Sequence, residues 1–212
     1  MLCIGARRHP GPWTAIAARV LGAILVVDAV IFATDPLVNH TWSAKESLPL
    51  ALCDVALLIA AAACWWPSQP LLVELTWFWG LAGTLQAVAT PDLSVGFPHL
   101  EFFEYVVGHV GIVVTALYLV VGLGYRPRPG SVRRVFLITV AYTAFVGLVD
   151  ATTGADYMFL ASRPVHWSLL SVLGPWPWYL VSAAGLALVL LVILDAPFRS
   201  GRRHDPPAHP AA

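Results

Sequence analysis

Six long apolar runs constrain this chain more than any other feature of its sequence. Each run is long enough, at about 1.5 Å per residue, to cross about 30 Å of hydrocarbon as a helix. Within hydrocarbon, a helix satisfies its own backbone hydrogen bonds, whereas an open strand edge cannot. The sequence therefore predicts an all-α, polytopic transmembrane helical bundle with spans at Trp13–Phe32, Leu48–Trp65, Leu71–Ala89, Tyr105–Leu123, Val132–Asp150 and Trp178–Asp195.

Composition supports a membrane protein and argues against a nucleic-acid partner. Of the 212 residues, 58% are hydrophobic and only 11% are charged, which is too little polar surface for a soluble domain. Twelve Lys and Arg residues balance twelve Asp and Glu residues, so the net charge attracts no polyanion. We therefore expect a multi-pass membrane protein whose partners are membrane lipids.

The basic residues predict the orientation of the bundle. With the N-terminus in the cytoplasm, only Lys45 and Arg163 fall on the outer side, and all other Lys and Arg residues lie at the inner side, as the positive-inside rule requires. Both termini are then cytoplasmic. The predicted organisation is a cytoplasmic segment over residues 1–12, one transmembrane domain over residues 13–198, and a disordered cytoplasmic tail over residues 199–212.

Polar side chains on five of the six predicted spans fall at one depth. In the predicted orientation this depth lies in the outer half of the bilayer, and the inner half offers little beyond Glu74. A conduit needs polar groups across the full thickness, so this layer weighs against a transporter or a channel. It favours a pocket that opens to the outer leaflet, formed by Asp28, Cys53, Gln86, His109 and Asp150.

Cys53 and His109 are the two members of this layer that can do chemistry together. An adjacent imidazole can take the proton of a thiol and so create a nucleophilic thiolate. Glu101 and Tyr105 precede His109 at four-residue intervals, so either can share its helix face and orient the ring. Asp54 points about 100° away from Cys53 and is better placed to bind a group on a neighbouring helix.

Two other interpretations of the same residues remain open. Cys53 and His109 can be packing and hydrogen-bonding residues of a non-enzymatic protein that binds a lipid or a partner, because free cysteine is commonly buried. Alternatively, a metal-dependent membrane hydrolase can be built from acidic and histidine residues around the fourth span, although their spacing matches no sharp zinc motif, and no metal ion is predicted. The residues concerned are Asp92, His99, Glu101, Glu104 and His109.

Glycines and the last long connector give two further expectations. Gly108 and Gly111 flank His109 and should allow a neighbouring helix to approach closely. The connector from Ala151 to Pro175 is long and partly apolar, which predicts a lid or an interfacial helix.

Three segments of the sequence resemble a known family. "LPLALCD", "ELTWFWGLAGTLQAVATPDLSVGFPHLEFFEYVVGH" and "DYMFL…LGPWPWYL" are similar to YwaF-like bacterial integral membrane proteins, a group related to the transmembrane-protein-164 acyltransferase family. The resemblance implies a helical enzyme that moves fatty acyl groups between phospholipids through an intramembrane cysteine and histidine, which fall on Cys53 and His109. The chain departs from its bacterial relatives at Ala51, where they carry a histidine, and in having six predicted spans rather than seven.

The leading hypothesis is therefore an acyltransferase of the plasma membrane that needs no cofactor. His109 acts as the general base, and Cys53 attacks an ester carbonyl of a phospholipid, forming a thioester that passes its acyl chain to a lysophospholipid. Gln86, or backbone N–H groups at the start of the fourth span, are expected to stabilise the oxyanion. Asp54, Asp150 and Tyr157 are expected to support or orient the site.

Overall fold

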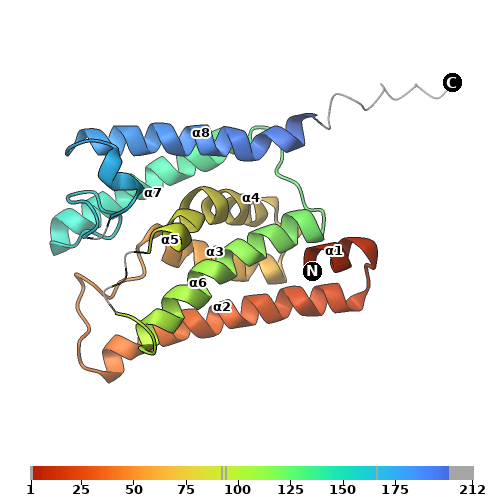
Figure 1. Cartoon of the computed structure of the whole chain (residues 1–212), viewed down its shortest axis with the longest axis horizontal. Coiled ribbons are helices and arrows are strands. Elements are labelled where there is room, and N and C mark those ends of the chain that lie inside the picture. The colour runs from red at the N-terminus through yellow and green to blue at the C-terminus, as the bar shows by residue number, and fades with distance from the viewer. Residues whose placement is uncertain (1, 92, 94, 166, 201–212) are drawn as a thin grey trace.

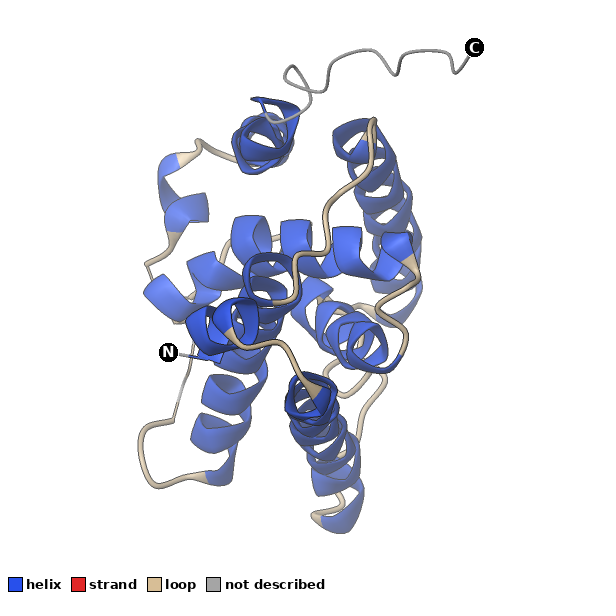
Figure 2. Ribbon diagram, turned by 90° about the vertical axis from the view of Figure 1, so that its right-hand side faces the viewer, coloured by secondary structure: helices blue, strands red, loops and turns tan. Residues whose placement is uncertain are grey.

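The computed structural model describes residues 2–91, 93, 95–165 and 167–200, and within these ranges the chain forms helices and loops only (Figures 1 and 2). Two π-helical segments, η1 and η2, continue α4 and α6, and η3 is a short 3₁₀ helix. In chain order the elements are α1 (Leu2–Arg8), α2 (Pro12–Val38), α3 (Leu52–Trp65), α4 (Pro70–Phe78), η1 (Trp79–Thr84), α5 (Leu85–Ala89), α6 (Leu100–Leu117), η2 (Tyr118–Gly122), α7 (Ser131–Thr153), η3 (Leu169–Val172) and α8 (Trp178–Ser200).

The predicted fold class is confirmed, with one span shorter than expected. Five of the described helical segments are long and apolar enough to cross a membrane: α2, the continuous α4–η1–α5, α6 with η2, α7 and α8. The sixth, α3, is apolar but has only 14 residues. The chain is thus a polytopic membrane protein. Figure 1 shows α1 and the end of α8 at the same end of the molecule, as an even number of spans requires.

Two predicted boundaries were wrong for identifiable reasons. The second span was expected from Leu48, but α3 begins at Leu52, because contacts from α7 and from the α7–α8 connector hold residues 48–50 outside the helix. The first span was expected to end at Phe32, with Asp35 and Pro36 in the connector. Instead, α2 runs through Pro36 to Val38, because a proline near the end of a helix removes only one backbone hydrogen bond.

Close packing of α2, α3 and α6 forms the larger part of the core. Many of the α3 side chains at this interface are alanines, and Ala56, Ala60 and Ala63 are completely buried. A Cβ atom added to Gly111 of α6 would lie 2.7 Å from Leu25 of α2, so the predicted close helix approach at this glycine is confirmed. The absence of side-chain bulk is what lets these three helices meet.

The remaining pair, α7 and α8, lies along the opposite side of the molecule from α2 (Figure 1). Two tryptophans of the third span join the pair to the core through their indole N–H groups. Trp79 donates to the Thr139 hydroxyl of α7 at 2.9 Å, and Trp77 donates to the Leu194 carbonyl of α8 at 3.3 Å. The connector between α7 and α8 contains the short helix η3 rather than a longer interfacial helix.

The fold therefore has two distinct ends. We call the end that carries α1, the loop between η2 and α7, and the last turns of α8 the basic end, because it holds Arg7, Arg19, Arg126, Arg128 and Arg134. We call the opposite end, where α3 begins, the cysteine end. The short helix α1 was not predicted, since residues 1–12 were expected to form a cytoplasmic segment.

Candidate functional site

Cys53 lies in the first turn of α3, at the cysteine end. The residue before the helix, Ala51, has an extended backbone, so Cys53 is only the second helical residue rather than the sixth of a longer helix. Backbone N–H groups in a first turn lack helical partners and favour negative charge. This position suits a thiolate or an oxyanion better than the second-turn position that the sequence predicted.

The nearest polar contact of the Cys53 sulfur comes from Thr84, the last residue of the π-helical segment η1. The Thr84 hydroxyl lies 4.0 Å from Cys53 Sγ, in position to donate to it, and Thr84 is almost completely buried. Sequence reasoning missed Thr84. The signal for it was a hydroxyl in an apolar helix directly after Gly83, but only the structure shows that it faces the cysteine.

His109 is held by Tyr105, one turn earlier on α6. The ring nitrogen Nδ1 lies 2.8 Å from the Tyr105 carbonyl oxygen, and the two rings stack with their centroids 4.0 Å apart. A carbonyl only accepts hydrogen bonds, so Nδ1 carries the proton and Nε2 of the neutral ring is left as an acceptor. This is the tautomer that a general base needs. Tyr105 thus contacts the imidazole through its backbone carbonyl and its ring face, and its role in orienting a catalytic histidine stays a prediction.

Cys53 and Tyr105, the residue that stacks on His109, contact the same short stretch of the third span. Cys53 contacts Thr84 at the end of η1, while the Tyr105 hydroxyl donates to the Ala87 carbonyl of α5 at 2.8 Å. Thr84 and Ala87 are three residues apart, so they lie on nearly the same side of that helix. In the described part of the chain, no hydrogen bond joins the cysteine to the histidine, and their pairing stays a prediction.

A recess of about 290 Å³ opens beside His109. Its walls come from α5, α6 and the loop between them, and apart from His109 and Tyr105 they are apolar, including Val88, Leu93 and Phe102. Cys53 is not among the residues that line it. The recess is suited to an apolar ligand that contacts His109.

Asp28 of α2 is buried against α6 beside the histidine. It is 7% exposed, and a Cβ atom at Gly108 would lie 2.7 Å from its Oδ2 and 3.1 Å from a methyl group of Leu57. The predicted close approach at Gly108 is thus confirmed. Glu104 interacts electrostatically with Asp28 and Asp35, and among the described residues no Lys or Arg pairs with these three carboxyl groups.

Asp54, Asp150 and Tyr157 serve the segments around the site rather than its centre. Asp54 accepts a hydrogen bond from the Ala51 N–H at 3.0 Å and so caps its own helix, and it also interacts electrostatically with Tyr142 of the neighbouring helix α7. Asp150 accepts from the Tyr157 N–H at 3.3 Å. The Tyr157 hydroxyl donates to the Ala44 carbonyl at 2.8 Å and accepts from the Leu48 N–H at 3.0 Å. These contacts fasten the connector before α3 to the end of α7.

Gln86 and Glu101 are two further predicted site residues whose side chains have no hydrogen bond among the described residues. Gln86 is half-buried on α5, one residue before Ala87, and its backbone carbonyl accepts from Thr90. Glu101 is exposed in the first turn of α6, two turns from His109. Neither side chain has a hydrogen bond in the described residues, so their expected roles as oxyanion donor and orienting carboxylate stay predictions.

The residues proposed for the alternative metal site are not gathered. Within residues 2–91, 93, 95–165 and 167–200, no three His, Cys, Asp or Glu side chains lie close enough together to hold a metal ion. His99, Glu101, Glu104 and His109 are therefore not brought together as ligands. Asp92 lies outside the described residues. Nothing in the described geometry supports the metal-dependent hydrolase.

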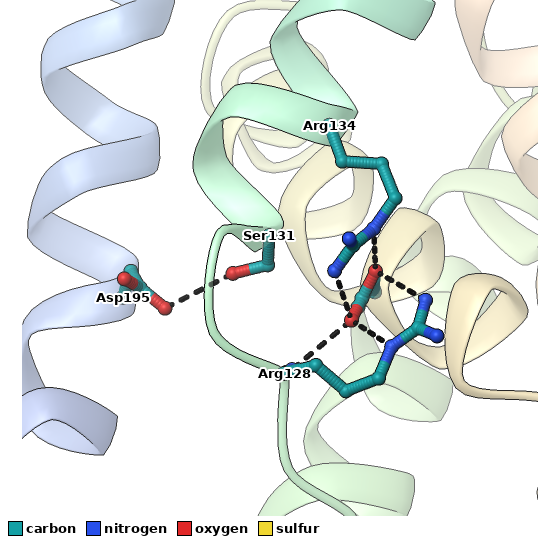
Figure 3. Close-up of polar contacts among 5 residues, drawn as sticks. Arg128, Ser131, Arg134 and Asp195 are labelled. Carbon is teal, nitrogen blue, oxygen red and sulfur yellow. Dashed lines mark hydrogen bonds and ion pairs between the residues drawn. The ribbon is translucent and has the colours of Figure 1, made fainter.

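The basic end contains a polar cluster that the sequence did not predict (Figure 3). Glu74 of α4 is completely buried, and its carboxylate accepts hydrogen bonds from Arg128 and Arg134 side chains at 2.9–3.2 Å and from the Arg128 N–H at 3.0 Å. The bond to Glu74 raises the pKa of Arg128. Nearby, Ser131 donates to Asp195 of α8 at 3.1 Å. This cluster fastens α7 and its preceding loop to α4 and α8.

Comparison with known proteins identifies one family. The family model described as the TMEM164 family matches residues 1–195, from α1 into the last turns of α8. No curated protein and no solved structure matches the chain. The match covers well over half of the chain and agrees with the family resemblance of its three sequence segments.

Proposed function

The chain belongs to the TMEM164 family, and from this premise we propose that it is a plasma-membrane acyltransferase that moves fatty acyl groups between phospholipids. The sequence resemblance to membrane acyltransferases supplies the reaction class. The observation that supports the proposal is the arrangement of His109, whose Nδ1–H is held by the Tyr105 carbonyl and whose side chain lines an apolar recess. Among the described residues, Nε2 has no hydrogen bond. A base of this kind next to a lipid-accessible recess is what acyl transfer from a phospholipid requires.

In the proposed first half-reaction, His109 Nε2 takes the proton of the Cys53 thiol. The thiolate attacks the carbonyl carbon of an acyl ester, and a C–S bond forms as the carbonyl electrons move to oxygen. When the tetrahedral intermediate collapses, the C–O bond breaks, and the imidazolium returns its proton to the leaving lysophospholipid oxygen. Backbone N–H groups of the first turn of α3 are close to Cys53 and supply positive potential for the oxyanion.

In the second half-reaction, His109 takes the proton of the acceptor hydroxyl. The resulting oxygen nucleophile attacks the thioester, the C–S bond breaks, and the thiolate regains its proton from the imidazolium. A lysophospholipid as acceptor gives acyl transfer, and water as acceptor gives hydrolysis. Thr84 contacts Cys53 and keeps the sulfur on the side of α3 that faces η1.

The test is an acyl-exchange assay with purified protein in liposomes that contain a labelled phospholipid donor and a lysophospholipid acceptor. Cys53→Ala should abolish exchange, and His109→Gln should lower it by about 10²- to 10⁴-fold. The other cysteines provide matched controls, because Cys3 and Cys64 lie at the basic end and Cys3→Ala and Cys64→Ala should keep activity. Mass spectrometry should find the trapped acyl chain on Cys53. Full activity of Cys53→Ala would overturn the mechanism.

A second function, lipid or partner binding without catalysis, is favoured by one observation. The hydrogen-bonding contact of Cys53 is a threonine hydroxyl rather than the imidazole, as expected of a packed cysteine. The two functions predict different reactivities for the Cys53 thiol, because the reactivity of a cysteine follows its thiolate character and its accessibility. A lipid-soluble iodoacetamide should label Cys53 faster in wild type than in His109→Gln if the residues act together. Equal, slow labelling of both proteins would favour the binding function.

A further inference from the structure

The basic end contains a larger recess than the one beside His109. It has a volume of about 440 Å³ and lies between α1, the first turns of α2, the end of α3 and the residues after η2. Its volume is within the range of small-molecule binding sites. The recess is at the opposite end of the bundle from Cys53, so the proposed acyl transfer does not use it.

The helix α1 is docked firmly enough to form a wall of this recess. Its residue Ala6 is buried in a small cluster with Ala18, Cys64 and Tyr118. A Cβ atom at Gly122 would lie 3.3 Å from the Cys3 backbone, so α1 rests directly on η2. The Tyr118 hydroxyl donates to the Thr14 carbonyl at 2.9 Å and ties the start of α2 to the same place. The recess is therefore a built feature of the fold.

Two arginines are the charged residues that line the recess in the described part of the chain. Arg7 comes from α1 and Arg19 from α2, both are exposed, and no acidic residue of the described ranges lines the recess. Among the described residues, neither arginine forms an ion pair. Arg128 and Arg134 of the same end differ from them, because their guanidinium groups are bound to Glu74. Two free guanidinium groups at one recess favour a phosphate ligand.

Apart from the arginines and the hydroxyl groups of Thr14 and Tyr125, the lining is largely apolar, and part of it comes from the membrane span α2. Ala15, Ala18 and Trp65 line the recess together with the arginines. Since α2 is a membrane span, its first turns lie at the level of the lipid head groups, where an indole ring such as that of Trp65 is favourable. A soluble phosphate would leave this apolar surface uncovered, whereas the glycerol backbone and upper acyl chains of a lipid would cover it.

We propose that this recess binds the phosphate head group of an anionic phospholipid, through Arg7 and Arg19. The positive-inside orientation places the lipid in the cytoplasmic leaflet. The bound lipid covers the apolar part of the recess and contacts both α1 and α2, so it also holds α1 against the bundle. This site is independent of the acyl-transfer site and of the function proposed for it.

The test is native mass spectrometry of the detergent-solubilised full-length protein after titration with phosphatidylglycerol. The wild type should retain phosphatidylglycerol in preference to phosphatidylcholine. Arg7→Gln and Arg19→Gln should each weaken retention about fivefold, which corresponds to ~1 kcal/mol per basic residue near an anionic lipid, and the double variant should lose the preference. Arg8→Gln is the matched control, because Arg8 is exposed on the same helix but does not line the recess. It should bind like the wild type.

A second variant tests the shape of the recess separately from its charge. Ala15 is an exposed lining residue, so Ala15→Trp fills the recess, keeps both arginines and should lower phosphatidylglycerol retention as strongly as the double variant. Equal retention by the wild type and the double variant would overturn the proposal, as would undiminished binding by Ala15→Trp. Competition by glycerol 1-phosphate at the same concentration as the lipid would also overturn it, because the ligand would then be a soluble phosphate.

Discussion

Glu74 and Asp28 are both carboxyl side chains in membrane-crossing helices, but their surroundings are opposite. Glu74, at the basic end, is completely buried and accepts hydrogen bonds from two arginines. Asp28, at the cysteine end, is 7% exposed, faces Gly108 and has no hydrogen bond among the described residues. A carboxylate in low dielectric is costly unless it is paired. The comparison indicates that the basic end is built for stability, whereas the cysteine end leaves a buried carboxyl group without a charge partner among the described residues.

The largest effect should come from removing the partners of Glu74. Arg128→Gln combined with Arg134→Gln leaves a buried carboxylate uncompensated and should lower the free energy of unfolding by about 3–5 kcal/mol. Denaturant unfolding in detergent micelles measures the change. Adding Glu74→Gln to the double variant should restore much of the loss, because the buried charge is then gone. Arg133→Gln, at an exposed neighbouring position, should stay near wild type. A double variant as stable as wild type would remove the structural role of the cluster.

The next effect concerns the helix contact beside Asp28. Gly108→Ala places a methyl group 2.7 Å from Asp28 Oδ2 and 3.1 Å from Leu57, and overpacking of this kind should destabilise the protein by about 1–3 kcal/mol. Gly185→Ala on α8 is the matched control, because nothing lies within 4 Å of its Cβ position. It should be neutral or slightly stabilising, since alanine favours helix more than glycine does. Similar unfolding midpoints for the two variants would show that α2 and α6 are not tightly packed at this end.

A smaller effect is expected at the start of α3. Asp54→Ala removes the carboxylate that accepts from the Ala51 N–H and should cost about 1 to 2 kcal/mol of unfolding free energy. Asp54→Asn retains an acceptor oxygen and should lose less than half of that amount. Because the first turn also positions Cys53, labelling of Cys53 by iodoacetamide should change in Asp54→Ala more than in Asp54→Asn. If labelling changed more in Asp54→Asn than in Asp54→Ala, the capping hydrogen bond would not be what positions Cys53.

The smallest effect should come from Asp28 itself. Asp28→Asn keeps the shape of the side chain and removes an acid that has no cationic partner among the described residues. The free energy of unfolding should therefore change by less than about 0.5 kcal/mol, unlike the loss expected at the Glu74 cluster. Thermal unfolding in detergent measures both. A loss of several kcal/mol in Asp28→Asn would mean that this carboxylate is as structural as Glu74, and the contrast between the two ends would fail.

Much of the candidate site could be predicted because its parts are local. His109 and Tyr105 are one helical turn apart, so their stacking follows from helix geometry. The close approach at Gly108 and Gly111 follows from the lack of a side chain. The beginning of α3 could not be predicted, because Tyr157 and Tyr142, about a hundred residues away in sequence, bind Leu48 and Leu50. Thr84 could not be found either, since its role depends on how the third span is rotated toward Cys53.

The sequence by itself determined that this chain crosses a membrane as a bundle of helices, because hydrocarbon requires each apolar span to satisfy its own backbone. It also determined which end of the bundle is basic. Successive spans run in opposite directions, and the arginines lie at those span ends that fall on the same side of the membrane. Tertiary structure alone decided which polar groups meet: Glu74 with two arginines, Cys53 with Thr84, and α1 against η2. Hydropathy reports the depth of a residue, whereas the rotation of each helix about its axis, set by side-chain packing, selects the partner.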